Sequence, residues 1–156
     1  MLFAREVTGP LSSLLKQFDA SVAKNKDADL KSFAVFLTED SEAMETKLKA
    51  FSEKEKISEN VPLTVVESLS GPEPYKINKD AEVTVMLYNK GKVVSNFAFK
   101  AGEMKEKDVK AIVAQIPKIL PDEGELKEKA EREAKLKKDV EELKKKLEAA
   151  KEKEKK

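Results

Sequence analysis

The sequence has 156 residues, and 40% of them are apolar, which is enough to build one hydrophobic core. It contains no Cys, His or Trp, so it has no thiolate nucleophile, no imidazole base and no histidine or cysteine ligand for zinc. Its 31 basic and 30 acidic residues leave a net charge of +1, which gives no overall attraction for nucleic acid or an anionic membrane. We therefore expect no cofactor, no metal site, and neither a nucleic-acid nor a membrane partner.

No apolar stretch approaches the roughly 18 residues that a membrane span requires. The first ten residues include Arg5 and Glu6 and lack an apolar core segment, so we expect no signal peptide. A chain without cysteine fits the reducing cytoplasm, although composition alone leaves the location unknown.

Composition divides the chain near Leu120. Charged residues occupy 25 of the 35 positions from 122 to 156, and no Gly, Pro or aromatic residue follows Gly124. The preceding part alternates short apolar runs with helical patterns. We therefore predict a globular domain over residues 1–120 and a charged C-terminal helix over residues 121–156.

The first predicted element is a short strand over residues 1–4, followed by a turn at Thr8, Gly9 and Pro10, with proline at the start of a helix. Apolar residues then recur every three or four positions, which predicts a helix with one buried face. These positions are Leu11, Leu14, Leu15, Phe18 and Val22. The apolar run at residues 33–37 contains β-branched and aromatic residues and predicts a strand buried on both faces.

A second helix is predicted to begin after a cap at Asp40 or Ser41. Its apolar positions are Ala43, Met44, Leu48, Phe51 and Ile57. Residues 62–66 then predict a third strand, and the chain is broken at residues 71–74, where glycine and two prolines occur.

Residues 83–88 and 93–99 predict two antiparallel strands around a turn that contains Gly91. A final helix is predicted from near Lys105 to Ile119. The order β-α-β-α-β-β-β-α predicts the α/β class, with a mixed sheet flanked by helices. Because helical crossovers join the early strands, we expect helices on both faces of this sheet.

The segment from Phe3 to Leu11 resembles the active-site segment of the thioredoxin-like superfamily, in which a strand leads through tryptophan into Cys-Gly-Pro-Cys and a helix. Gly9 and Pro10 match this pattern, whereas Thr8 and Leu11 stand at the two cysteine positions.

Downstream, Tyr75-Lys76-Ile77 and residues 83–93 are similar to the family's Tyr-x-Ile, cis-Pro-Thr, strand and Asn-Gly hairpin pattern, with Val83 at the cis-proline position. The inserted helix and strand over residues 41–66 resemble the redoxin and peroxiredoxin branch. The resemblance covers residues 3–120 and implies a thioredoxin-like domain that is abbreviated at its N-terminus.

The departures from the family pattern imply a redox-inactive, non-catalytic domain. Disulfide exchange requires a thiolate, and the Thr8 hydroxyl has no histidine base to activate it. A cis bond before a residue other than proline costs about 2.5 to 4 kcal/mol, so we expect a trans bond before Val83. Two interpretations of the segment follow: a simple helix-start turn, or a protein-binding groove that comprises Thr8, Gly9, Pro10 and Val83.

In the charged helix, Glu and Lys recur four residues apart, as at Glu141 and Lys145, which supports a helix without a core. Apolar residues follow a 4-3-4 spacing and form a possible helix seam. Its members are Leu136, Val140, Leu143 and Leu147. Three arrangements fit this spacing: the seam docks on the preceding domain, pairs with a second copy in a weak homodimer, or remains bare on a monomer.

The leading functional hypothesis is a protein-interaction or scaffold domain with an unknown protein partner. The regular helix, built from Glu, Lys, Ala and Leu, suggests an alternative: an engineered or computationally generated chain, with a trimmed redoxin-like body and an idealised helix, selected for folding or target binding. A third alternative is an enzyme with a non-thiol site that the sequence does not reveal. We expect no enzyme and no catalytic residue.

Overall fold

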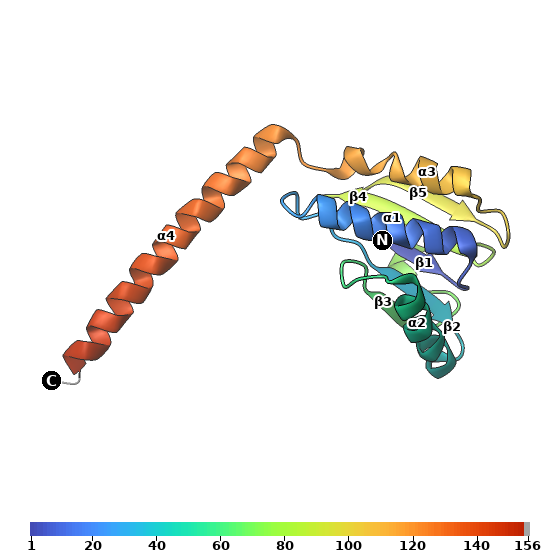
Figure 1. Cartoon of the computed structure of the whole chain (residues 1–156), viewed down its shortest axis with the longest axis horizontal. Helices are drawn as coiled ribbons and strands as arrows, with labels where there is room; N and C mark the ends of the chain where they lie inside the picture. The colour runs from blue at the N-terminus through green and yellow to red at the C-terminus, as the bar shows by residue number, and fades with distance from the viewer. Residues whose placement is uncertain (155–156) are drawn as a thin grey trace. The chain divides into compact units, whose positions relative to one another are not determined.

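The computed structural model describes residues 1–154, with side chains up to Glu148. The chain forms two compact units, Met1–Leu120 and Pro121–Lys156. Figure 1 shows the elements of both units in chain order. Within the described residues, no helix is long and apolar enough to cross a membrane.

The first unit contains a five-stranded mixed sheet, which confirms the predicted α/β class. Its strands are β1 (Leu2–Ala4), β2 (Ala34–Thr38), β3 (Leu63–Glu67), β4 (Val83–Asn89) and β5 (Lys92–Phe99). Their order across the sheet is β3-β2-β1-β4-β5. The three-residue strand β1 is therefore central, with β2 parallel to it on one side and β4 antiparallel to it on the other.

The helices of this unit are α1 (Gly9–Lys24), α2 (Ser41–Glu55) and α3 (Glu106–Val113). Two short 3-10 helices, η1 (Glu73–Tyr75) and η2 (Ile116–Ile119), complete it. The predicted last helix is therefore shorter than expected, because Pro117 has no N–H to donate to the carbonyl of Val113, where α3 ends. Ile57 also lies beyond α2, which ends at Glu55 and is followed by Lys56 in the left-handed conformation, although the Ile57 side chain is buried.

All three helices of the first unit contribute to a single apolar cluster, so the expectation of helices on both faces of the sheet is wrong. Leu11 of α1, Leu48 of α2 and Ile112 of α3 belong to this cluster, together with alternate strand residues such as Leu2 and Phe36. The handedness of the connections explains the result. The chain moves from β1 to β2 and from β2 to β3 in the same direction, and right-handed crossovers then place both helices on one face.

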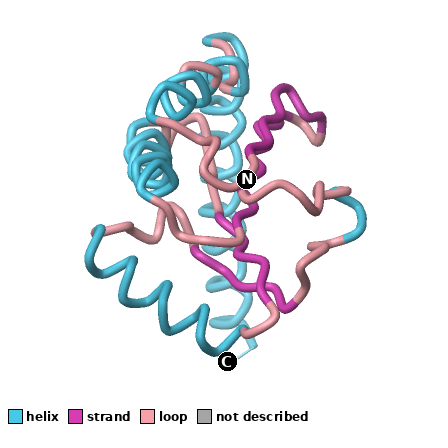
Figure 2. Tube along the Cα trace, turned by 90° about the vertical axis from the view of Figure 1, so that its right-hand side faces the viewer, coloured by secondary structure: helices cyan, strands magenta, loops and turns pink. Residues whose placement is uncertain are grey.

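The opposite face of the sheet is covered by the segment of residues 68–82 between β3 and β4, which we call the covering segment. Figure 2 shows its loops and short helix on the side of the strands away from the helices. Ile77 is buried against a second apolar cluster that includes Phe3 and Leu37. The rings of Phe3 and Tyr75 lie 5.1 Å apart between centroids. This half of the core therefore depends on a segment with little regular structure.

The second unit contains one long helix, α4 (Glu123–Glu154). Asp122 caps it, since its Oδ1 accepts from the Glu125 N–H at 2.8 Å and its own N–H donates to the Glu125 carboxylate at 3.3 Å. Two of the predicted ion pairs are present, between Glu141 and Lys145 at 3.4 Å and between Glu142 and Lys146 at 2.6 Å. These contacts support the helix locally.

Candidate functional site

Thr8, Gly9 and Pro10 form the start of α1. Thr8 is the cap residue, and its carbonyl accepts from the Ser12 N–H at 2.9 Å, whereas its side chain makes no capping hydrogen bond. Gly9 and Pro10 are the first two residues of the helix, where a missing proline N–H has no cost. These three residues thus have a sufficient structural role as a strand-to-helix turn.

Val83 lies beside the end of β1, where it pairs with Ala4 across the sheet. Its side chain is 1% exposed and belongs to the helix-covered core cluster. The described chain contains no cis peptide bond, which confirms the trans bond expected before Val83. Val83 is thus paired with a residue four positions before Thr8, and its side chain is buried in the core and does not line a surface groove.

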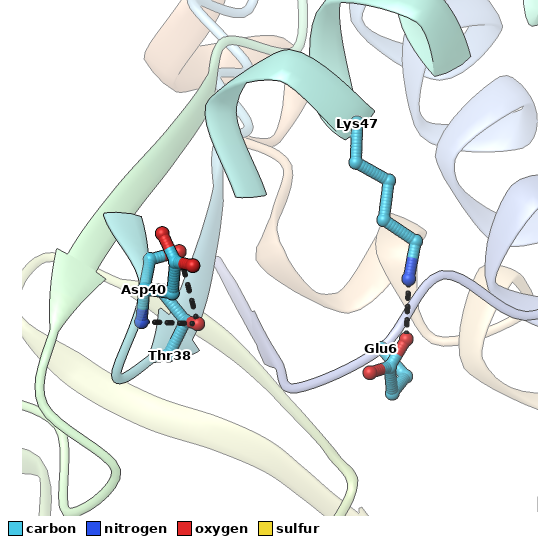
Figure 3. Close-up of polar contacts among 4 residues, drawn as sticks. All are labelled: Glu6, Thr38, Asp40 and Lys47. Atoms are coloured by element: carbon cyan, nitrogen blue, oxygen red, sulfur yellow. Dashed lines mark hydrogen bonds and ion pairs between the residues drawn. The ribbon is translucent and has the colours of Figure 1, made fainter. Parts of the chain in front are cut away.

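Two separate pairs of polar side chains, which we call the polar cluster, lie near the carboxyl ends of β1 and β2, as Figure 3 shows. Asp40 Oδ1 accepts from the Ala43 N–H at 3.0 Å, so Asp40 caps α2, and the Asp40 N–H donates to Thr38 Oγ1 at 3.1 Å. Lys47 of α2 pairs with Glu6 at 2.6 Å, and both side chains are about half exposed. The Asp40 cap thus defines where α2 begins, and the Glu6–Lys47 pair joins α2 to the loop after β1.

This polar cluster has no arrangement suited to catalysis. The Asp40 carboxylate is engaged by the backbone of α2, and Glu6 is neutralised by Lys47. Among the described residues, no group of three or more His, Cys, Asp or Glu side chains is placed to hold a metal ion. The cluster is therefore accounted for by the stability of the fold.

Arg5, directly after β1, holds the covering segment at both ends. Its Nε donates to the Ala81 carbonyl at 2.8 Å, and its Nη1 donates to the Leu69 carbonyl at 2.6 Å. The planar guanidinium suits two such carbonyls at fixed positions. Sequence reasoning did not identify this role, because the two acceptors are backbone atoms that leave no pattern in the side chains.

Two carboxyl groups join α1 to the region around the end of α2, and both have lowered pKa values. Partial burial alone would raise the pKa of Asp19, but hydrogen bonds from the Ser58 hydroxyl, the Asn60 amide and the Ser58 N–H outweigh it and lower the pKa. The pKa of Glu55 is lowered mainly by its contact with Lys16, at 2.5 Å. Because the hydrogen-bond donors to Asp19 and Glu55 are residues of the fold itself, contacts that hold the fold together explain both lowered pKa values.

A groove of about 560 Å³ lies between α2 and the edge strand β3. Apolar side chains of Leu48, Ile57 and Val61 line it, and Glu45 and Lys49 lie among its charged residues.

The predicted helix seam on α4 is the most exposed apolar feature described. The exposed fractions are 62% for Leu136, 43% for Val140, 64% for Leu143 and 56% for Leu147. Four large apolar side chains in one row on a charged helix are an unusual surface for a chain in water. The seam is therefore the strongest candidate for a binding site.

Comparison of the chain with protein-family models, with curated proteins and with solved structures found no match.

Proposed function

We propose that this protein is a redox-inactive thioredoxin-fold protein that acts through protein contacts, as an interaction or scaffold domain, and that the seam on α4 provides the contact surface. The thioredoxin resemblance is supported by the central β1, which leads directly into α1 and lies between parallel β2 and antiparallel β4. The chain contains no cysteine, so the thiol chemistry of that family is not possible here.

The observation that carries the proposal is the row formed by Leu136, Val140, Leu143 and Leu147, each at least 43% exposed. Burial of apolar surface contributes about 25 cal/mol per Å², so a partner that covers this row gains free energy from all four side chains. The heptad spacing of the row fits the face of another helix, because side chains spaced four and three residues apart interlock along two helices.

An enzymatic function finds less support in the same structure. The Thr8 hydroxyl has no histidine to activate it, and the polar groups near it are used by caps and a surface ion pair. The two shifted carboxyl groups, Asp19 and Glu55, are held by neighbouring side chains. An enzyme would be expected to bring such groups together in one pocket.

A pull-down from cell extract with the full chain as bait tests the proposal. The variants are Leu143→Ser with Leu147→Ser on the seam, Lys145→Ser away from it, and Thr8→Arg at the start of α1. We expect specific captured proteins to be lost with the seam variant and retained with the other two. Identical capture by all four baits would contradict a role for the seam, and loss with Thr8→Arg alone would indicate the groove near α1 instead.

A further inference from the structure

The charges on α4 are not distributed evenly around the seam. In heptad notation, Val140 and Leu147 occupy position a, and Leu136 and Leu143 occupy position d, which are the core positions of a two-helix coiled coil. Positions e and g lie on either side of this core and contact the flanks of the partner helix. These flanking positions decide which partners are attracted and which are repelled.

Within residues 132–147, four of the five flanking positions are basic. They are Arg132, Lys137, Lys144 and Lys146, and the fifth is Asp139. The flanks of the seam therefore carry a net charge of +3 over this stretch, although α4 as a whole is almost neutral. The acids Glu141 and Glu142 occupy positions b and c, farther from the seam.

Two of the flanking lysines remain available for a partner. Lys137 and Lys144 make no ion pair with any part of the chain that the structure describes, while Lys145 and Lys146 pair with Glu141 and Glu142. Lys137 and Lys144 also line a shallow groove of about 350 Å³ along α4, together with Leu136, Val140 and Glu141. Since Glu141 already pairs with Lys145, the two lysines are, among the described residues, the unpaired charges beside these apolar groups.

A second copy of this chain fits the seam less well than an acidic helix does. In an antiparallel pair centred on the seam, e positions face e positions and g positions face g positions. Lys137 of each copy would lie beside Lys144 of the other, and these like charges destabilise the pair. Asp139 would lie beside Lys146 and attract it, so only the g flank favours a second copy, whereas an acidic helix attracts the lysines on both flanks.

A membrane surface also fits less well than a helix. The described seam is one narrow row of a and d side chains, and α4 contains no Trp, Tyr or Phe to lie at a lipid interface. Membrane-bound helices expose a wider apolar face.

Building on the proposed protein-contact function, we propose that the α4 seam binds a helix of a different protein whose own apolar seam is flanked by Glu or Asp. Such a helix supplies side chains to interlock with Leu136, Val140, Leu143 and Leu147. Its acids neutralise the basic flanks, with Lys137 and Lys144 as the main contacts. The interaction is a heterotypic coiled coil in which charge selects the partner.

Two synthetic helical peptides, each about four heptads long, test this proposal. Both carry Val at a and Leu at d, and they differ only in having Glu or Lys at e and g. We expect the full chain to bind the acidic peptide at least about tenfold more tightly than the basic one in calorimetry, and added salt to weaken this binding. Equal binding of the two peptides, or preference for the basic one, would overturn the proposal.

A charge-reversal variant provides the specific test. Lys137→Glu with Lys144→Glu changes the flanks of the seam and should switch the preference to the basic peptide. Lys138→Glu with Lys145→Glu makes the same change in net charge at position f, opposite the seam, and should leave the preference unchanged. If both variants behave alike, the flanking lysines do not select the partner, and the proposal fails.

Competing occupants give different results. Sedimentation that shows a stable homodimer of the chain alone would overturn the proposal, as would tight binding to phosphatidylserine vesicles with no binding to either peptide. If neither peptide binds but the cell-extract capture still depends on Leu143 and Leu147, the proposed partner class is wrong and the protein-contact function stands. If that seam-dependent capture is also absent, the proposed function itself fails.

Discussion

Gly71 is the single residue at which the fold most clearly requires glycine. Its φ is +67°, and a Cβ added there would lie 3.3 Å from side-chain atoms of both Ile77 and Leu37. Gly9, at the start of α1, has no such constraint, because nothing lies within 4 Å of the equivalent position. We therefore expect Gly9 to tolerate a Cβ atom and Gly71 not to tolerate one without strain.

We expect Gly71→Ala to lower the free energy of unfolding by at least about 1 to 2 kcal/mol, from the left-handed backbone conformation and the close contacts. Gly9→Ala should change it by less than about 0.5 kcal/mol. Thermal and urea denaturation of the two variants measure the difference. Equal effects would show that the covering segment is not packed as described.

Asp19 connects α1 to the loop after α2, and its lowered pKa gives the connection a defined pH dependence. A carboxyl whose pKa is lower in the folded state stabilises the fold above its unfolded pKa of about 3.9, and this stabilisation is lost as the pH falls. We expect Asp19→Ala to cost about 1 to 2 kcal/mol at pH 7, through the loss of its hydrogen bonds.

The stability difference between wild type and Asp19→Ala should become smaller as the pH falls from about 5 to about 3. Urea denaturation across this range measures it. Glu53→Ala, a substitution of an exposed acid on α2, serves as a comparison. A difference that stayed constant or grew on acidification would contradict the assigned hydrogen bonds.

At the scale of elements, the covering segment depends on Arg5. Its two hydrogen bonds to backbone carbonyls hold residues 69 and 81, near the two ends of the segment. Since hydrogen bonds from charged donors contribute about 1.5 to 3 kcal/mol, we expect Arg5→Ala to loosen the segment and expose the second apolar cluster. Hydrogen exchange should then become faster in residues 68–82.

Lys47→Ala is the matched control for Arg5→Ala. It removes a cation that pairs with the neighbouring residue Glu6, but this pair is about half exposed and is expected to contribute less than about 1 kcal/mol. Exchange in the covering segment should remain as in wild type. If Arg5→Ala also leaves exchange unchanged, the segment is held by its apolar contacts alone.

Elements with a strong periodic pattern could be predicted from the sequence. The stripe of α1 is buried at the five positions expected, and the β4–β5 turn has positive φ at Lys90 and Gly91, as a tight hairpin requires. The face of the sheet on which each helix packs could not be predicted from periodicity. It depends on the strand order, in which β2 and β3 lie on the same side of β1, and the residue pattern of a strand does not show which strand lies next to it.

The candidate site was predicted in part. The spacing of Leu136, Val140, Leu143 and Leu147 identified the seam directly, because a heptad pattern can be read from local sequence. The Thr8 and Val83 groove came from a family resemblance, and the burial of Val83 depends on which strands lie beside β1. Local sequence patterns do not predict such long-range packing. They also do not predict which backbone carbonyls accept hydrogen bonds from Arg5.

Across the whole chain, the two units have different proposed roles. The first unit, Met1–Leu120, has a core covered by three helices on one face and by the covering segment on the other. The second unit carries the exposed seam and its basic flanks. Thr8, Gly9 and Pro10 form a strand-to-helix turn, and the proposed binding surface lies on α4.

The most direct test of this account is the affinity of the full chain for the acidic heptad peptide, measured by calorimetry for wild type, Thr8→Arg and Leu143→Ser with Leu147→Ser. We predict equal affinity for wild type and Thr8→Arg, and a loss of about tenfold or more for the seam variant. Binding that is abolished by Thr8→Arg and unaffected by the seam substitutions would contradict it.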